Sequence, residues 1–168
     1  MARIFLSIGS NIEPELNLKS CASSLACHFT NPVWSPLYRS AAEGMVGDDF
    51  LNAMVMIHTE QSIESIYQLL KKIEDCHGRI RSTNKFTNRT LDIDLLLYND
   101  AVMDTPNITL PSSEIITAAY VLIPLVDLAP DDMHPVTGKS YQDILKDLEH
   151  IHPDFRTNLH PISLNLAP

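Results

Sequence analysis

Apolar residues occupy every second position along three stretches of the chain, residues 3–8, 50–59 and 91–97. A period of two predicts strands, because successive side chains of a strand point to opposite faces of a sheet. The apolar face of the second stretch is formed by Leu51, Ala53, Val55 and Ile57. In the third stretch the apolar face is formed by Leu91, Ile93, Leu95 and Leu97. Asp92 and Asp94 therefore share the opposite face of that strand.

Helical spacing of apolar residues predicts four helices, over residues 15–28, 62–77, 115–128 and 141–149. Ser62 and Ser140 are suited to cap the second and fourth helices, and Gly78 is a natural stop for the second. Pro124 lies inside the third helix, where we expect a kink or a break.

Residues 33–40 are extended and contain Pro36, which predicts an edge strand or a bulge because proline cannot donate to a ladder. The elements thus follow the order β-α-β-β-α-β, with extra strands and helices after them. This order predicts an α+β fold with a ferredoxin-like core, a mostly antiparallel sheet with helices on its faces (an α/β/α sandwich). We expect residues 1–150 to form a single domain and residues 151–168 to form an irregular C-terminal tail.

The acidic pair on the third strand is the first candidate for chemistry. Asp92 and Asp94 lie about 7 Å apart along the strand and repel each other unless a cation lies between them. Hard divalent cations suit such carboxylates, and Mg²⁺ held by two carboxylates commonly also holds substrate phosphates. An Asp-x-Asp pair by itself is equally typical of a solvated strand face.

The segment before this strand carries an isolated group of positive charges. Four of the chain's 12 Lys and Arg residues lie between residues 79 and 89, where there is no acidic residue: Arg79, Arg81, Lys85 and Arg89. A basic segment leading into a carboxylate strand favours phosphoryl transfer, in which a protein supplies positioning and charge neutralisation. The plainer interpretation is a solvated charged surface.

Composition narrows the class of protein. The 168 residues carry a net charge of −9, which argues against nucleic acid as the main partner. No apolar run approaches the roughly 18 residues of a membrane span, and the N-terminus lacks a signal-peptide pattern, so we expect a cytoplasmic protein without membrane contact. The spacing of the three cysteines and seven histidines fits neither a disulfide framework nor a zinc site.

These pieces together resemble the 6-hydroxymethyl-7,8-dihydropterin pyrophosphokinase family from about residue 4 to residue 145. The resemblance is carried by motifs in the ranges 8–11, 37–40, 50–53, 78–81 and 89–94, of which Arg-Thr-Leu-Asp-Ile-Asp is the most specific. It implies an ATP pyrophosphotransferase of folate biosynthesis that modifies the hydroxymethyl group of 6-hydroxymethyl-7,8-dihydropterin and releases AMP. Two Mg²⁺ ions, ATP and the pterin are the implied cofactors and partners, and the chain is expected to be a monomer.

The resemblance also implies roles for individual residues. The expected catalytic residues are Arg79, Arg89, Asp92 and Asp94, with Asp92 and Asp94 as the metal ligands. The expected pterin-binding residues are Ser40, Phe50, Asn52 and Tyr120. The expected ATP-binding residues are Lys71, Glu74, Arg81, Phe86, Arg89, Ile93 and Ser112. The loops 41–49 and 79–90 are expected to close over the nucleotide.

The sequence departs from the family pattern at two single positions and in one loop. Ser112 replaces a histidine and Ala118 replaces an arginine, both nucleotide contacts in the family, and Ala41-Ala42 replaces a proline-rich start of the pterin loop. We therefore expect weaker use of ATP than in a typical member. A catalytically impaired pterin-binding paralogue, or an enzyme with a changed acceptor, are the alternatives that these departures leave open.

Overall fold

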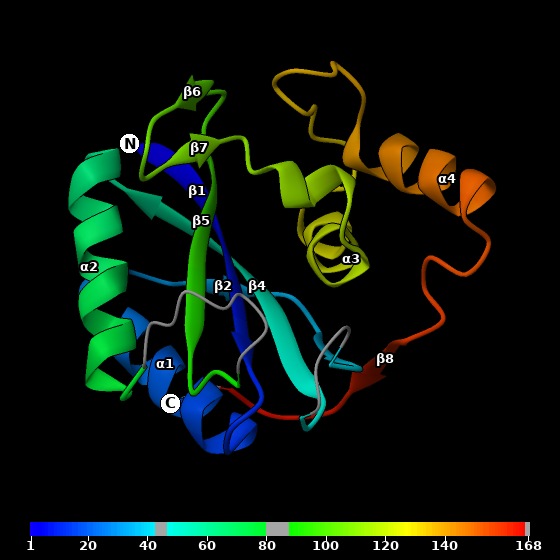
Figure 1. Ribbon diagram of the computed structural model, residues 1–168. Helices are drawn as coiled ribbons and strands as arrows, with labels where there is room; N and C mark the ends of the chain where they lie inside the picture. Colours follow the sequence, from blue (N-terminus) through cyan, green and yellow to red (C-terminus); the bar gives the residue numbers. More distant parts are fainter. Residues whose placement is uncertain (43–46, 80–87, 167–168) are drawn as a thin grey trace.

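A six-stranded antiparallel sheet forms the middle layer of the protein (Figure 1). The computed structural model describes residues 1–42, 47–79 and 88–166. The main strands follow one another across the sheet in the order β5 (Asp92–Tyr98), β1 (Ala2–Ser10), β4 (Phe50–Thr59), β3 (Leu37–Ser40) and β8 (Leu159–Ile162). The short strand β2 (Val33–Trp34) also pairs with β4. A separate hairpin consists of β6 (Met103–Asp104) and β7 (Thr109–Leu110).

Helices cover both faces of the sheet. The helices α1 (Pro14–His28) and α2 (Ile63–Cys76) pack on one face, and α3 (Ala119–Leu128) and α4 (Tyr141–Ile151) lie over the other (Figure 1). The predicted α/β/α sandwich is confirmed. The core strands β5-β1-β4-β3 also have the order expected of the ferredoxin-like plan.

The alternation in β1 and β4 divides the apolar side chains between two cores. Ile4, Leu6 and Ile8 of β1 pack under α1 and α2, whereas Phe5 and Met54 pack with α3 and α4. Toward the end of β1 and the start of β4, this second face carries Ser7, Gly9 and Asn52, which bury little apolar area, and the half-buried ring of Phe50. The sheet therefore has an open region there, beside α3.

Pro36 interrupts the third extended segment as predicted, because β2 and β3 are separated by Ser35 and Pro36. The Ser35 side chain replaces the missing ladder contacts. Its Oγ accepts a hydrogen bond from the Met54 N–H at 2.9 Å, and the Ser35 N–H donates to the Met54 carbonyl at 2.9 Å.

The prediction for β5 is right at its start and wrong at its end. Leu91, Ile93 and Leu95 face α1 and α2, but Leu97 packs in the core beneath α3. The pairing with β1 shifts register between Phe5 and Leu6, so β5 carries one extra residue there. Such a bulge exchanges the faces of all later side chains. Asp92 and Asp94 precede the bulge and keep their shared face.

The predicted helix 115–128 is two separate elements. A 3₁₀-helix, η1, spans Ser113–Ile116, and α3 begins only at Ala119 because Ala118 has an extended backbone (φ −118°, ψ 121°). Pro124 lies inside α3 and does not end it. The break turns the start of α3 toward the open region of the sheet.

The prediction of an irregular tail is wrong for residues 159–162, which form β8 and pair with β3. Ile162, Leu164 and Leu166 then pack against the core beside α1. Pro161 fits because β8 is the outer strand of the sheet. Within the described ranges, no helix is long and apolar enough to cross a membrane.

Candidate active site

The open region of the sheet forms a cleft of about 740 Å³ beside α3. Its floor consists of the side chains that the second face of the sheet leaves uncovered. From β1, β3, β4 and β5 these are Ser7, Gly9, Ser40, Phe50, Asn52, Asp92 and Asp94. Arg89 and Tyr120 also line the cleft, so both expected metal ligands, one of the expected catalytic arginines and all four expected pterin-binding residues meet at one cavity.

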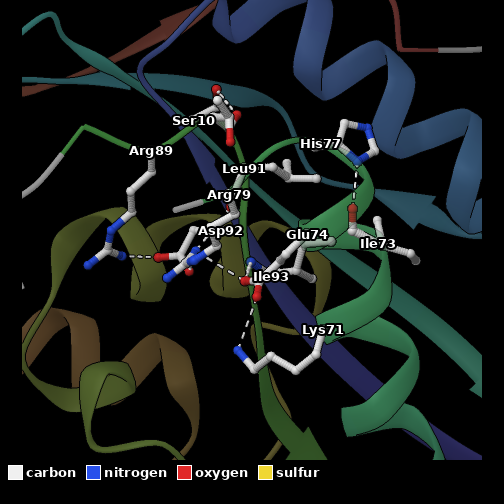
Figure 2. A network of polar contacts seen from close by, with 11 residues as sticks. Ser10, Lys71, Ile73, Glu74, His77, Arg79, Arg89, Leu91, Asp92 and Ile93 are labelled. Carbon is white, nitrogen blue, oxygen red and sulfur yellow. Dashed lines mark hydrogen bonds and ion pairs between the residues drawn. The ribbon is translucent and has the colours of Figure 1, made fainter. Parts of the chain in front are cut away.

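Asp92 is the centre of a charged network at one end of the cleft (Figure 2). The guanidinium groups of Arg79 and Arg89 form ion pairs with its two carboxylate oxygens, Arg79 with Oδ1 and Arg89 with Oδ2. Arg79 also donates to the Leu91 carbonyl at 3.0 Å and to the Glu74 carboxylate at 3.1 Å. The structure thus brings three of the expected catalytic residues into direct contact.

Glu74 links this network to helix α2 (Figure 2). Its side chain is fully buried, and its Oε1 accepts a hydrogen bond from the Ile93 N–H at 2.9 Å. Its Oε2 accepts from the Lys71 ammonium group at 3.1 Å. Because β5 is an outer strand, the Ile93 N–H has no strand partner on that side, and Glu74 takes the place of one. Glu74 therefore holds the strand that carries the acidic pair.

Ser10 and Asn11, at the end of β1, fix the segment that enters β5. The Asn11 side chain accepts from the Arg89 N–H at 2.7 Å and donates to the Asn88 side chain at 2.8 Å. The Ser10 hydroxyl donates to the Thr90 carbonyl at 2.6 Å. The sequence identified residues 8–11 as a motif of the family resemblance but indicated no contact with Arg89 or Thr90. These contacts set the position from which the Arg89 side chain reaches Asp92.

Asp94 differs from Asp92 because its side chain is exposed at the cleft. The surrounding protein disfavours the charged carboxylate and raises the pKa of Asp94 above its ordinary value, and the negative charge of Glu74 adds to this. The positive charges of Lys71, Arg79 and Arg89 act in the opposite direction. A cation bound beside Asp94 would also favour the ionised form.

The other end of the cleft is built from aromatic and amide side chains. Phe50 and Asn52 lie on the same face of β4, and Tyr120 lies in the first turn of α3. The Asn52 amide donates to the Ser40 hydroxyl at 2.9 Å. A Cβ atom at Gly9 would lie 3.3 Å from the Asn52 side-chain oxygen and 3.8 Å from the Phe50 ring, so glycine keeps the floor flat here.

The expected ATP-binding residues lie in several environments. Lys71 is paired with Glu74, the Ile93 side chain is buried on the opposite face of the sheet, and the Ser112 hydroxyl caps η1 by accepting from the Glu114 N–H at 3.3 Å. Arg81 and Phe86 lie outside the described residues, as do parts of both predicted closing loops. The ATP contacts of all these residues stay predictions.

Sequence reasoning missed one wall of the cleft entirely. It consists of residues that follow α4, namely His152, Asp154, Phe155, Asn158 and Leu159. Glu114, Thr117 and Ala119 around the start of α3 were also missed, whereas Ala118 was singled out only as a departure.

The carboxylates of Asp92 and Asp94 could bind a metal ion whose remaining ligands come from the substrate and water. Among the described residues there is no group of three or more His, Cys, Asp or Glu side chains that could hold a metal. Two carboxylates on one strand face match Mg²⁺, which retains waters and is bound through one or two carboxylates together with substrate phosphates. Asp92 and Asp94 fit that requirement.

Comparison with known proteins gives one consistent result. The sequence model of the 7,8-dihydro-6-hydroxymethylpterin-pyrophosphokinase (HPPK) family matches residues 5–130. A Synechocystis protein named 2-amino-4-hydroxy-6-hydroxymethyldihydropteridine pyrophosphokinase is 33% identical over 147 residues, covering 86% of this chain and 75% of the relative. A Haemophilus influenzae protein of the same name is 28% identical over 139 residues, covering 80% of this chain and 86% of the relative.

Solved structures agree with the fold. The crystal structure of a Plasmodium falciparum HPPK-DHPS triple mutant superposes with a TM-score of 0.78 at 12% identity. The match covers 97% of this chain and 47% of the solved chain, so this chain spans about half the length of that protein.

Proposed function

The chain belongs to the HPPK family, and from this and the site geometry we propose that it transfers pyrophosphate from ATP to 6-hydroxymethyl-7,8-dihydropterin, releasing AMP, in folate biosynthesis. The observation that carries the proposal is the cleft itself. A carboxylate pair with two arginines lies at one end, and two aromatic rings with an amide lie at the other. A flat heterocycle binds between aromatic rings with an amide at its edge, and a polyphosphate binds beside arginines and carboxylate-held cations, so one cleft can bind both substrates next to each other.

Asp92 and Asp94 are the residues that would hold Mg²⁺. Bound there, the metal would neutralise phosphate charge and align the attacking and leaving oxygens. Charge balance supports this, because the described side chains of the network, Lys71, Glu74, Arg79, Arg89, Asp92 and Asp94, carry three positive and three negative charges. A network that is neutral overall leaves the several negative charges of ATP unbalanced, which supports divalent cations at the acidic pair.

The protein's own groups act chiefly by positioning. Phe50, Tyr120 and Asn52 would hold the pterin ring so that its hydroxymethyl oxygen points toward the acidic pair. That oxygen bonds to the β-phosphorus of ATP and loses its proton to water, while the bond from this phosphorus to the oxygen shared with the α-phosphorus breaks, which releases AMP. Arg79 and Arg89 would stabilise the charge that develops on the phosphate oxygens.

Release of AMP tests the proposal directly. With ATP and Mg²⁺ we expect AMP only when the pterin is present, and removal of Mg²⁺ with a chelator should stop its release. Asp94→Ala should lower the rate roughly a hundredfold or more, since it removes a charge that acts at the reacting phosphate. The matched control is Asp131→Ala, an exposed carboxylate outside the cleft, which should retain the full rate.

Binding measurements separate the possible failures. If the folded wild type binds the pterin and releases no AMP, the protein is a binding-only paralogue and the proposal is wrong. If Asp94→Ala retains the wild-type rate, the metal role is wrong. We also infer that the active form is a monomer, and sedimentation of the active protein tests this.

A further inference from the structure

The segment between α4 and β8 forms the wall of the cleft that lies farthest from the acidic pair. Phe155 and Asn158 line the same cavity as Phe50, Asn52 and Tyr120. The match to the HPPK family model ends at residue 130, so this wall lies outside the residues that the family model matches.

The segment is held in place by local contacts. The Phe155 N–H donates to the His152 carbonyl at 2.9 Å, and the Leu159 N–H donates to the Arg156 carbonyl at 3.0 Å. The Arg156 side chain forms an ion pair with Glu149 of α4. Phe155 and Leu159 are half-buried against the core beneath α3 and α4. The wall is therefore anchored at both ends, by α4 and by β8 (Figure 1).

Sheet register places this wall opposite the acidic pair. Asp92, Gly9 and Asn52 lie in one row across β5, β1 and β4. Phe50, Ser40 and Leu159 lie in the neighbouring row across β4, β3 and β8. With strands about 4.8 Å apart, β5 and β8 each lie about 10 Å from β4, on opposite sides. An acceptor centred over Asn52 thus has the acidic pair at one end and the segment at the other.

The chemistry of this wall suits the ring end of the acceptor. When the hydroxymethyl group points toward Asp92, the pyrimidine edge, with its amine, ring N–H and carbonyl, points away from it. The Asn158 side chain has both a donor and an acceptor for such an edge. Phe155 adds an apolar surface that excludes water from it.

We propose that Phe155 and Asn158 form a specificity wall that selects acceptors with an unsubstituted pterin pyrimidine edge. The inference rests on the proposed function, because it assumes that the pterin hydroxymethyl group lies beside Asp92. It adds two residues that belong to no motif by which the family resemblance was found.

Substitutions on this segment test the proposal. In the full chain, Phe155→Ala and Asn158→Ala should each raise the acceptor KM about fivefold to tenfold and leave the ATP KM within about twofold. They should also lower the preference for 6-hydroxymethyl-7,8-dihydropterin over its 2-N-methyl derivative, which a purely structural role would not change. Thr157→Ala, an exposed neighbour that does not line the cleft, is the matched control and should behave as wild type.

Further measurements keep the outcomes distinct. Phe155→Leu retains most of the packing and should show the same loss of selectivity if Phe155→Ala fails to fold. Calorimetric titration with the pterin alone decides the inference even in a protein that releases no AMP, and that lack of turnover would overturn only the proposed function. Wild-type acceptor affinity and selectivity in both Phe155→Leu and Asn158→Ala would overturn the specificity wall.

Discussion

Replacing Glu74 should destabilise the protein more than any other single change of a charged residue in α2. Glu74→Ala removes a fully buried carboxylate and leaves Arg79, whose side chain is 16% exposed, without one of its two acidic partners. It also leaves the Ile93 N–H without its acceptor. Breaking a buried ion pair costs about 3–5 kcal/mol, and an orphaned buried N–H costs about 1–3 kcal/mol.

These two costs overlap, because Arg79 retains Asp92 and Lys71 is 28% exposed and can turn to water. We therefore expect Glu74→Ala to lower the free energy of unfolding by about 3–5 kcal/mol in total. Glu74→Gln retains one oxygen as an acceptor for the Ile93 N–H but loses the charge and replaces the acceptor of Lys71 by an NH2 donor, so we expect a smaller cost of about 1–3 kcal/mol.

Urea unfolding followed by far-ultraviolet circular dichroism measures both values. The control is Glu64→Ala, an exposed carboxylate in the first turn of the same helix, for which a loss below about 1 kcal/mol is expected. The unfolding slope should stay constant across the variants, since the native surface is the same. A Glu74→Ala protein within about 1 kcal/mol of wild type would refute the assignment of Glu74 as the anchor of β5.

Three further predictions concern other parts of the molecule. Burial raises the pKa of the Cys21 thiol to about 12, so a thiol reagent should label Cys27 and Cys76 in the native protein and reach Cys21 only after unfolding. Burial lowers the pKa of His134, so only the unfolded state gains a proton as the pH falls through about 6.5, and the free energy of unfolding should decline by up to about 1.4 kcal/mol per pH unit. His134→Asn should make this pH dependence of the free energy of unfolding less steep, and an equally steep dependence in the variant would contradict the role given to His134. Phe50→Ala should weaken pterin binding by more than about 1 kcal/mol in calorimetric titrations, and unchanged affinity would argue against stacking on this ring.

The sequence predicts the two-faced strands and the shared face of the acidic pair, because alternation has a fixed geometric meaning. It does not predict the bulge in β5. The run Leu95, Leu96, Leu97 is apolar throughout, so no polar residue marks where the register shifts. For this reason Leu97 lies on the face opposite to the predicted one, whereas Asp92 and Asp94 lie on the predicted face.

The packing of the C-terminal residues beyond β8 was missed for a different reason. Residues 162–166 alternate as Ile-Ser-Leu-Asn-Leu, a pattern that indicates a buried face, but Pro161 directly precedes them and proline disfavours an inner strand. Proline is compatible with an outer strand such as β8. Contacts such as those of Asn11 with Arg89 join residues that are far apart along the chain, and a single sequence has no local signal for them.

The acidic pair lies on an outer strand, which explains why several side chains form hydrogen bonds with the backbone of that strand. An outer strand has one row of backbone groups without a strand partner, and here Glu74 and Arg79 take up those of Ile93 and Leu91. The same Arg79 is bound to Asp92, so the groups that fix the strand are continuous with the groups that carry the charge. Buried, fully paired networks of this kind restrict the geometry of their members. On the proposed function, stability and catalysis are therefore coupled at this edge, and we expect variants of Glu74 to affect turnover even though its carboxylate is buried beneath the acidic pair.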